Sequence, residues 1–141
     1  ILYLNKVNKY NKHIYYIYIY MSEKEFITEI TSRQHLLELI NNNTGILVLK
    51  FGAEWCGPCK RIEQLVKDWF NLMPANVTCG IIDCDESFDV YAFYKNKKIV
   101  KTIPAILRFN AENDHWAPDD AIFSSDHDEV TEFFQRIIND A

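Results

Sequence analysis

Residues 46–51, Ile-Leu-Val-Leu-Lys-Phe, form a nearly continuous apolar run that leads directly into a Trp-Cys-Gly-Pro-Cys segment. Such a run is typical of a strand that is buried on both faces of a parallel sheet, because half-exposed strands alternate apolar and polar residues. Parallel strands need crossover helices between them, so the run predicts an α/β architecture. The cysteines of that segment, Cys56 and Cys59, lie where this strand gives way to the next element.

Hydrophobic periodicity and turn residues divide the rest of the chain into alternating strands and helices. Residues 25–30 alternate apolar and polar and predict a strand, and Thr31 or Ser32 is placed to cap the helix that follows. Near the end of the chain, Ser125 and Asp128 form a capping-box pattern before an amphipathic helix. The predicted order is β-α-β-α-β-α-β-β-α. The other predicted elements are helices at 33–42, 56–73, 87–95 and 129–138, and strands at 77–83, at 102–109 and within 110–129.

The first 20 residues differ from the rest of this 141-residue chain. They contain six Tyr and four Ile but no acid, Gly, Pro or Ala. They show no signal-peptide cleavage site, and their apolar run is too short to span a membrane. We therefore expect residues 1–20 to be a dispensable leader and residues 21–141, beginning at Met21, to form one domain. The alternative is an additional strand or a disordered tail.

The charge balance is acidic, with 15 basic and 20 acidic residues and a formal net charge of −5. Three of the lysines lie in the first 20 residues, so residues 21–141 hold 12 basic and 20 acidic residues, a formal charge of −8. This balance argues against a nucleic-acid-binding domain. The chain has four cysteines and no convincing secretory signal, so a reducing compartment, the cytoplasm, fits better than a secreted disulfide framework.

Two residues separate Cys56 from Cys59, which places both sulfurs on one turn, close enough to form a strained but reversible disulfide. The Cys56 sulfur is expected to face the unpaired N–H groups at the start of the following helix, and these favour thiolate over thiol. A thiolate at this position attacks a disulfide to form a mixed disulfide, which Cys59 then resolves.

Two other interpretations of the cysteines are a zinc site and an inert buried pair. Zinc would need Cys79 and Cys84 to complete four ligands. These two lie five residues apart on or just past one strand, and an odd separation sends strand side chains to opposite faces. The inert pair fits poorly with the flanking Trp55 and Gly-Pro, which suit an exposed redox turn. We expect Cys79 to be a core thiol and Cys84 to be partly exposed.

The segment WCGPCK, the buried strand before it and the segment TIPA before a later strand resemble the thioredoxin family, over roughly residues 22–140. The resemblance implies a thioredoxin fold, in which helices flank a central mixed β-sheet. It also implies a thiol–disulfide oxidoreductase that reduces protein disulfides and contributes to cell redox homeostasis. No bound cofactor is implied, because the redox-active disulfide Cys56–Cys59 carries the electrons.

The resemblance assigns roles to individual residues. Cys56 matches the family's nucleophile and Cys59 its resolving cysteine. Pro104 matches the cis-proline that faces the disulfide, so we expect a cis bond between Ile103 and Pro104. Ile103 is expected to offer backbone groups to an extended substrate. The resemblance also implies site-shaping roles for Trp55, Gly57 and Pro58.

The sequence departs from the family pattern at several positions around the redox turn. The family usually has a buried acid where this chain has Lys50, and commonly a basic residue near the position of Ile81. Gly52 stands where an aromatic or small polar residue is frequent, and Gln64 replaces a helix-kinking proline. The acid and base that transfer protons in the family are therefore not present in their usual form.

Strand alternation places Lys50 on the same face as Val48, and the resemblance implies that this face points into the space beneath the redox turn. A buried ammonium either loses its proton or finds an acid. Asp83 lies two residues beyond Ile81 on a strand that is expected to neighbour this one, so we expect a Lys50–Asp83 pair in which Asp83 or a neutral Lys50 takes the proton from Cys59. The alternative is that Lys50 extends to solvent and has no role.

The resemblance implies disulfide-containing protein substrates and a recycling reductase such as a thioredoxin reductase. We expect a monomer that binds neither nucleic acid nor membrane. The alternative function is a non-catalytic interaction module with a thioredoxin fold, resembling the spliceosomal thioredoxin-like proteins. Those proteins lack an intact Cys-Gly-Pro-Cys segment, whereas this chain keeps both cysteines, which favours the enzyme.

Overall fold

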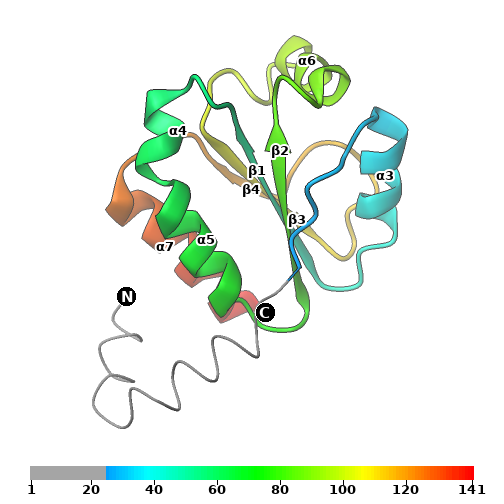
Figure 1. Ribbon diagram of the computed structural model, residues 1–141. Coiled ribbons are helices and arrows are strands. Elements are labelled where there is room, and N and C mark those ends of the chain that lie inside the picture. The colour runs from blue at the N-terminus through cyan, green and yellow to red at the C-terminus, as the bar shows by residue number, and fades with distance from the viewer. Residues whose placement is uncertain (1–24) are drawn as a thin grey trace, which may run out of the picture.

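The computed structural model describes residues 25–141, in which four strands form one mixed sheet in the order β2-β1-β3-β4 (Figure 1). β1 pairs in parallel with β2 and antiparallel with β3, and β3 pairs antiparallel with β4. The expected α/β fold with a central mixed sheet is confirmed. The leader expected at residues 1–20 lies outside the described residues. The strands are β1 (Ile46–Gly52), β2 (Val77–Asp83), β3 (Ala105–Asn110) and β4 (Asp120–Ile122).

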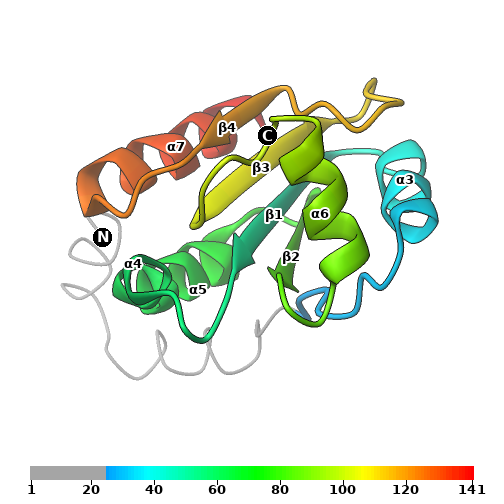
Figure 2. The same cartoon turned by 90° about the horizontal axis from the view of Figure 1, so that it is seen from above.

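Helices cover both faces of the sheet (Figure 2). Helices α5 (Glu63–Leu72) and α7 (His127–Asp140) pack on one face, and α3 (Arg33–Asn41) and α6 (Phe88–Asn96) pack on the other. The short helix α4 (Gly57–Arg61) follows the end of β1. Within residues 25–141, no helix has both the length and the apolar character needed to cross a membrane.

Strand β1 lies between two hydrophobic cores, as its apolar sequence predicts. Its residues from Ile46 to Phe51 are all buried. Ile46 and Val48 belong to the core under α5 and α7, while Leu47, Leu49 and Phe51 belong to the core under α3 and α6. This burial of both faces fixes the register of β1, because a slip of one residue would exchange its two sets of side chains.

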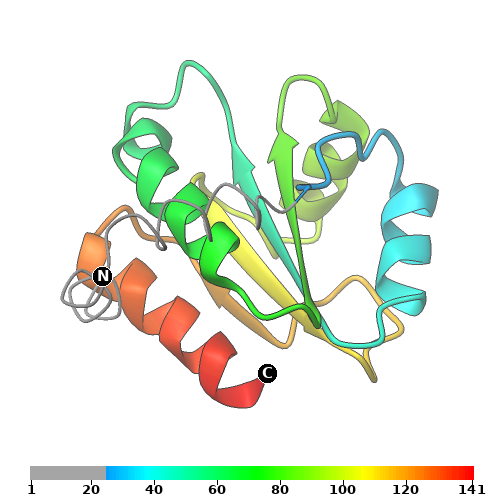
Figure 3. The same cartoon turned by 60° about the horizontal axis from the view of Figure 1, so that its bottom comes forward.

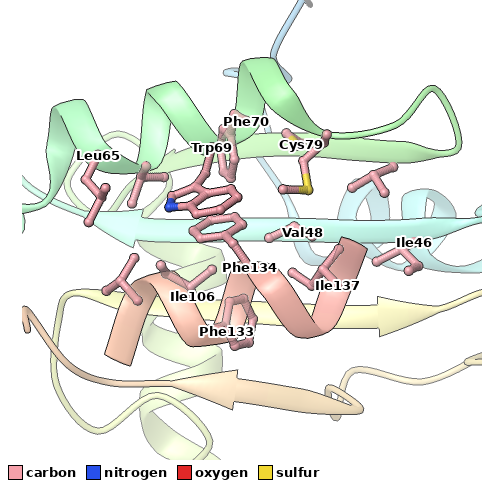
Figure 4. Packing of buried hydrophobic residues seen from close by; sticks show 14 of the residues in the cluster. Ile46, Val48, Leu65, Trp69, Phe70, Cys79, Ile106, Phe133, Phe134 and Ile137 are labelled. Atoms are coloured by element: carbon pink, nitrogen blue, oxygen red, sulfur yellow. The ribbon is translucent and has the colours of Figure 1, made fainter. Parts of the chain in front are cut away.

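Aromatic side chains fill the core between the sheet and the pair α5–α7. The two helices lie side by side along one face of the sheet (Figure 3). Trp69 of α5 stacks on Phe134 of α7 with ring centroids 5.7 Å apart, and Phe70 meets Phe134 edge to face at 5.8 Å (Figure 4). Val48 of β1 lies beneath these rings. Stacked and edge-to-face pairs add to the free energy already gained by burying the rings.

The strand expected at residues 25–30 is wrong. Only Ile27 pairs with the sheet, as an isolated parallel bridge to Gly80. Its N–H donates to the Cys79 carbonyl at 2.9 Å, and its carbonyl accepts from the Ile81 N–H at 2.8 Å. The chain then leaves the sheet edge because Ile30 is buried in the core under α3, next to the start of that helix. Ser32 caps α3 by accepting the His35 N–H, as expected.

The single helix expected at residues 56–73 is divided at Ile62 into α4 and α5. The Ile62 N–H points back to the Cys59 and Lys60 carbonyls, a tightened turn, and its backbone leaves helical geometry at φ −108° and ψ 1°. The break occurs without a proline, since Gln64 is an ordinary residue of α5. A buried apolar side chain at Ile62 accompanies the break.

The cap expected for the last helix at Ser125 is also wrong. Asp126 caps α7, and its Oδ1 accepts the N–H groups of Asp128 and Glu129, each at 3.0 Å. The Ser124 hydroxyl accepts the Asp126 N–H instead. A carboxylate combines the capping hydrogen bonds with a negative charge at the positive end of the helix.

We predict that Gly45→Ala lowers the free energy of unfolding by about 2 kcal/mol or more, because the added Cβ would collide with the backbone carbonyl of Asn76. That carbonyl accepts the Ile46 N–H at 3.0 Å and joins the starts of β1 and β2, so it cannot move freely. In the matched control, Gly57→Ala, the new Cβ meets no atom within 4 Å, and the expected change is no more than about 1 kcal/mol. Urea unfolding measures both, and equal small effects would contradict the predicted collision.

Candidate active site

Cys56 and Cys59 form a disulfide on the first turn of α4, with their Cα atoms 5.2 Å apart. Cys56 is the N-cap of α4, and its sulfur accepts the backbone N–H of Cys59 at 3.2 Å. Gly57 and Pro58 form the exposed start of the helix. A donated N–H stabilises negative charge on the Cys56 sulfur once the bond is reduced, so the local geometry favours Cys56 as the thiolate.

The loop before β3 meets the disulfide from the other side. The peptide bond between Ile103 and Pro104 is cis, which confirms the expectation. The Ile103 carbonyl oxygen lies 3.8 Å from the Cys56 sulfur, and the Ile103 side chain packs against Ala53 and both cysteines. The fold therefore brings the Ile103–Pro104 loop next to Cys56 and Cys59, although more than 40 residues separate the loop from either cysteine in the sequence.

Trp55 directly precedes Cys56 and is 67% exposed. Its indole N–H donates to the Asp85 carboxylate at 2.9 Å, which connects the turn after β1 to the turn after β2. Asp85 was not among the residues expected in the site. Its position could have been predicted from the two parallel strands, because the residues that follow β1 and β2 lie at the same edge of the sheet.

The expected ion pair between Lys50 and Asp83 is wrong. Among the described residues, no carboxylate lies within 4.0 Å of the Lys50 ammonium. Lys50 lies opposite Ile81 in the register of β1 and β2, whereas Asp83 lies opposite Gly52 at the end of the strand. The Asp83 Oδ1 accepts two backbone N–H groups of the next turn, from Asp85 at 2.8 Å and Glu86 at 3.1 Å.

Lys50 is buried, with only 6% of its surface exposed, so the alternative that it extends to bulk solvent is also wrong. It lines a cavity of about 240 Å³ beneath the redox turn, together with Gly52, Cys59, Glu63 and Asp83. Burial lowers the pKa of Lys50 below its ordinary value. The charge of Glu63 opposes this shift in pKa, and the charge of Lys67 adds to it.

Cys79 and Cys84 are buried in different cores, on opposite faces of the sheet, as their spacing predicts. The expectation that Cys84 is partly exposed is wrong, because only 1% of its surface is accessible. Burial raises the pKa of Cys84 to about 12, and the nearby charges of Asp83 and Asp85 add to the increase. A thiol with this pKa holds almost no thiolate near neutral pH and is a poor nucleophile.

We predict that the reduced native protein reacts with an aromatic disulfide reagent at two thiols, Cys56 and Cys59. The denatured protein should react at all four, because unfolding exposes Cys79 and Cys84 and returns the pKa of Cys84 toward its ordinary value. Thiol titration with and without denaturant measures the difference. Rapid reaction of a third thiol in the native protein would contradict the burial of this pair.

We predict that Lys50→Met stabilises the oxidised protein near neutral pH by about 1–3 kcal/mol, because it removes a buried amine that has no carboxylate within 4.0 Å. The pKa of Lys50 is lower in the folded than in the unfolded chain. Between these two values the unfolded state binds more protons, so the parent gains stability as pH rises. The advantage of the variant should therefore shrink as the pH approaches 10.5, the ordinary pKa of a lysine side chain.

Urea unfolding of both proteins across this pH range tests the prediction. The titration of buried Cys84 destabilises the folded state at alkaline pH, but it is common to both proteins and cancels in the difference. A difference in stability that does not change with pH would contradict the lowered pKa of Lys50.

Comparison with known proteins agrees with the site. The family model for thioredoxin matches residues 26–136. The thioredoxin of Pyropia yezoensis is 28% identical over 85 residues, which cover 60% of this chain and 75% of that protein. The thioredoxin of Mycoplasma pneumoniae is 33% identical over 84 residues, or 59% of this chain and 76% of that protein.

A similar structure is the X-ray structure of Fasciola hepatica thioredoxin, with a TM-score of 0.64 and 24% identity. The match covers 79% of this chain and 98% of that chain. This structural similarity supports the fold. The match to the family model and the disulfide at the redox turn support the chemistry. This chain belongs to the thioredoxin family and is a thiol–disulfide oxidoreductase with its redox pair at Cys56 and Cys59.

Proposed function

We propose that this oxidoreductase reduces disulfides in other proteins in the cytoplasm and is returned to its dithiol form by a reductase of the thioredoxin-reductase class. The observation that carries the proposal is the position of the Cys56 sulfur, 3.8 Å from the carbonyl of the partly exposed Ile103. An extended segment of a substrate that pairs with the Ile103 backbone would bring its own disulfide to Cys56.

The reaction proceeds in two exchanges. The Cys56 thiolate attacks one sulfur of the substrate disulfide, forms a mixed disulfide and releases the other substrate sulfur as a thiolate. Cys59 then loses its proton and attacks the Cys56 sulfur, which forms the Cys56–Cys59 bond and releases the second substrate sulfur. Two electrons have passed from the cysteines to the substrate, whose thiolates take up two protons.

The distribution of the cysteines supports a reducing compartment. The disulfide joins the two cysteines of the redox turn, while Cys79 and Cys84 are buried thiols on opposite faces of the sheet. Structural disulfides are typical of oxidising compartments. Here the disulfide joins the two reactive cysteines instead, and the two buried cysteines remain thiols. We propose that the protein acts as a monomer whose partners are its disulfide substrates and the recycling reductase.

Reduction of insulin disulfides in the presence of dithiothreitol tests the activity. The parent should accelerate precipitation of the insulin chains above the rate with dithiothreitol alone, and Cys56→Ser should abolish the acceleration. Cys84→Ala is the matched control, because it removes a cysteine that lies outside the redox turn, and it should remain active. A parent that does not exceed dithiothreitol alone would instead support the non-catalytic interaction module.

A further inference from the structure

Within residues 25–141, the amine of Lys50 is a buried titratable group next to the site that has no assigned function. We propose that Lys50 accepts the proton of Cys59 when Cys59 attacks the mixed disulfide. This inference rests on the proposed function and names the residue that moves the proton in its second exchange. It replaces the expected Lys50–Asp83 pair with a pair formed by Lys50 and the cysteine itself.

Gly52 shows how close the two groups lie. A Cβ built on Gly52 would lie 3.7 Å from the Cys59 sulfur and 3.9 Å from the Cε atom of Lys50. These two atoms are therefore no further apart than about 7.6 Å, the sum of the two distances. Because glycine has no side chain, the space between them is open to the Lys50 amine, which extends one bond beyond Cε.

The cavity supplies a route for the proton. Lys50, Gly52 and Cys59 all line the same cavity of about 240 Å³. A single water molecule occupies about 30 Å³ of liquid, so the space and its polar lining suit transfer directly or through solvent. Both reacting groups are buried, which strengthens the interaction between an amine and a thiol.

The charged groups that surround Lys50 have other partners or lie at exposed positions. From α5, Glu63 and Lys67 face it, but these two form an ion pair with each other at 3.8 Å. From the end of β2, Asp83 turns its Oδ1 to backbone N–H groups. Glu54 and Lys60 reach the rim of the cavity from exposed positions.

The protonation states fit the step. Burial lowers the pKa of Lys50 and so increases the fraction of neutral amine, the form that accepts a proton. The Cys59 thiol gives its proton to this amine, and its sulfur bonds to the Cys56 sulfur as the Cys56–substrate bond breaks. The resulting ammonium then releases its proton to solvent. The first attack, by Cys56, involves none of these transfers, so Lys50 acts on one of the two exchanges alone.

The test is stopped-flow mixing of the fully reduced protein with excess 5,5′-dithiobis(2-nitrobenzoate). Attack by Cys56 releases one coloured thiolate at a rate proportional to reagent concentration, and attack by Cys59 releases a second at a rate independent of it. Lys50→Met and Lys50→Gln should slow the second phase about tenfold or more near neutral pH, because both lack a base. The first phase should stay within about twofold of the parent.

The pH profile separates proton transfer from a merely structural role. In the Lys50 variants the second phase should rise with pH at a midpoint at least about one unit higher than in the parent, because Cys59 must ionise without help. Lys97→Met is the control, since it removes an exposed lysine that does not line the cavity, and both phases should stay at the parent rate. Circular dichroism confirms that each variant is folded.

The outcomes separate this inference from the proposed function. A parent that shows both phases and reduces insulin, with the same second phase and pH midpoint in both Lys50 variants, would overturn the role of Lys50 alone. A parent that shows both phases but fails to reduce insulin would overturn the proposed function and leave the role of Lys50 to be decided by its variants. Slowing of both phases alike in the variants would overturn the inference, because it would place Lys50 outside the resolving step.

Discussion

Burial of β1 on both faces is the constraint on which the rest of the structure depends. The strand holds the middle of the sheet between β2 and β3, and its side chains alternate between two cores. Its register is therefore fixed, and with it the point at which the chain leaves the sheet and enters the redox turn. The disulfide lies just past the end of β1, so the register of this strand determines the position of the reactive cysteines.

In the part of the chain that the structure describes, two charged side chains are buried on the strands of the sheet, Lys50 on β1 and Arg108 on β3, and their surroundings differ. Arg108 of β3 donates to Asp140 at 2.7 Å and to Asn110 at 2.9 Å, so its planar guanidinium is satisfied at the edge of α7. Lys50 has no such carboxylate and lies beside a cavity. A charge that is fully paired contributes to structure, whereas a buried base without an acid partner remains available to accept a proton.

Sequence patterns predicted the parts of the fold that local chemistry determines. The apolar runs of β1 and β2, the Ser32 cap and the cysteine spacing were each interpreted from neighbouring residues and are confirmed. The wrong predictions depended on contacts between distant segments. Asp83 is drawn to backbone N–H groups of its own turn, Asp85 reaches the site through the pairing of two strands, and residues 25–30 leave the sheet because Ile30 is needed in the core. The rules of strand alternation and helix capping consider neighbouring residues only, so they do not predict these contacts.

The break at Ile62 has a mechanical consequence for the redox cycle. When the disulfide opens, its two sulfurs must move apart, and a continuous helix would carry that displacement along its axis. Here α4 ends at Arg61, two residues after Cys59, and the Arg61 carbonyl at that end is held by the His127 ring at 2.8 Å. A displacement of the redox turn therefore reaches a backbone break at Ile62, and the same point is tied to the first residue of α7 through His127.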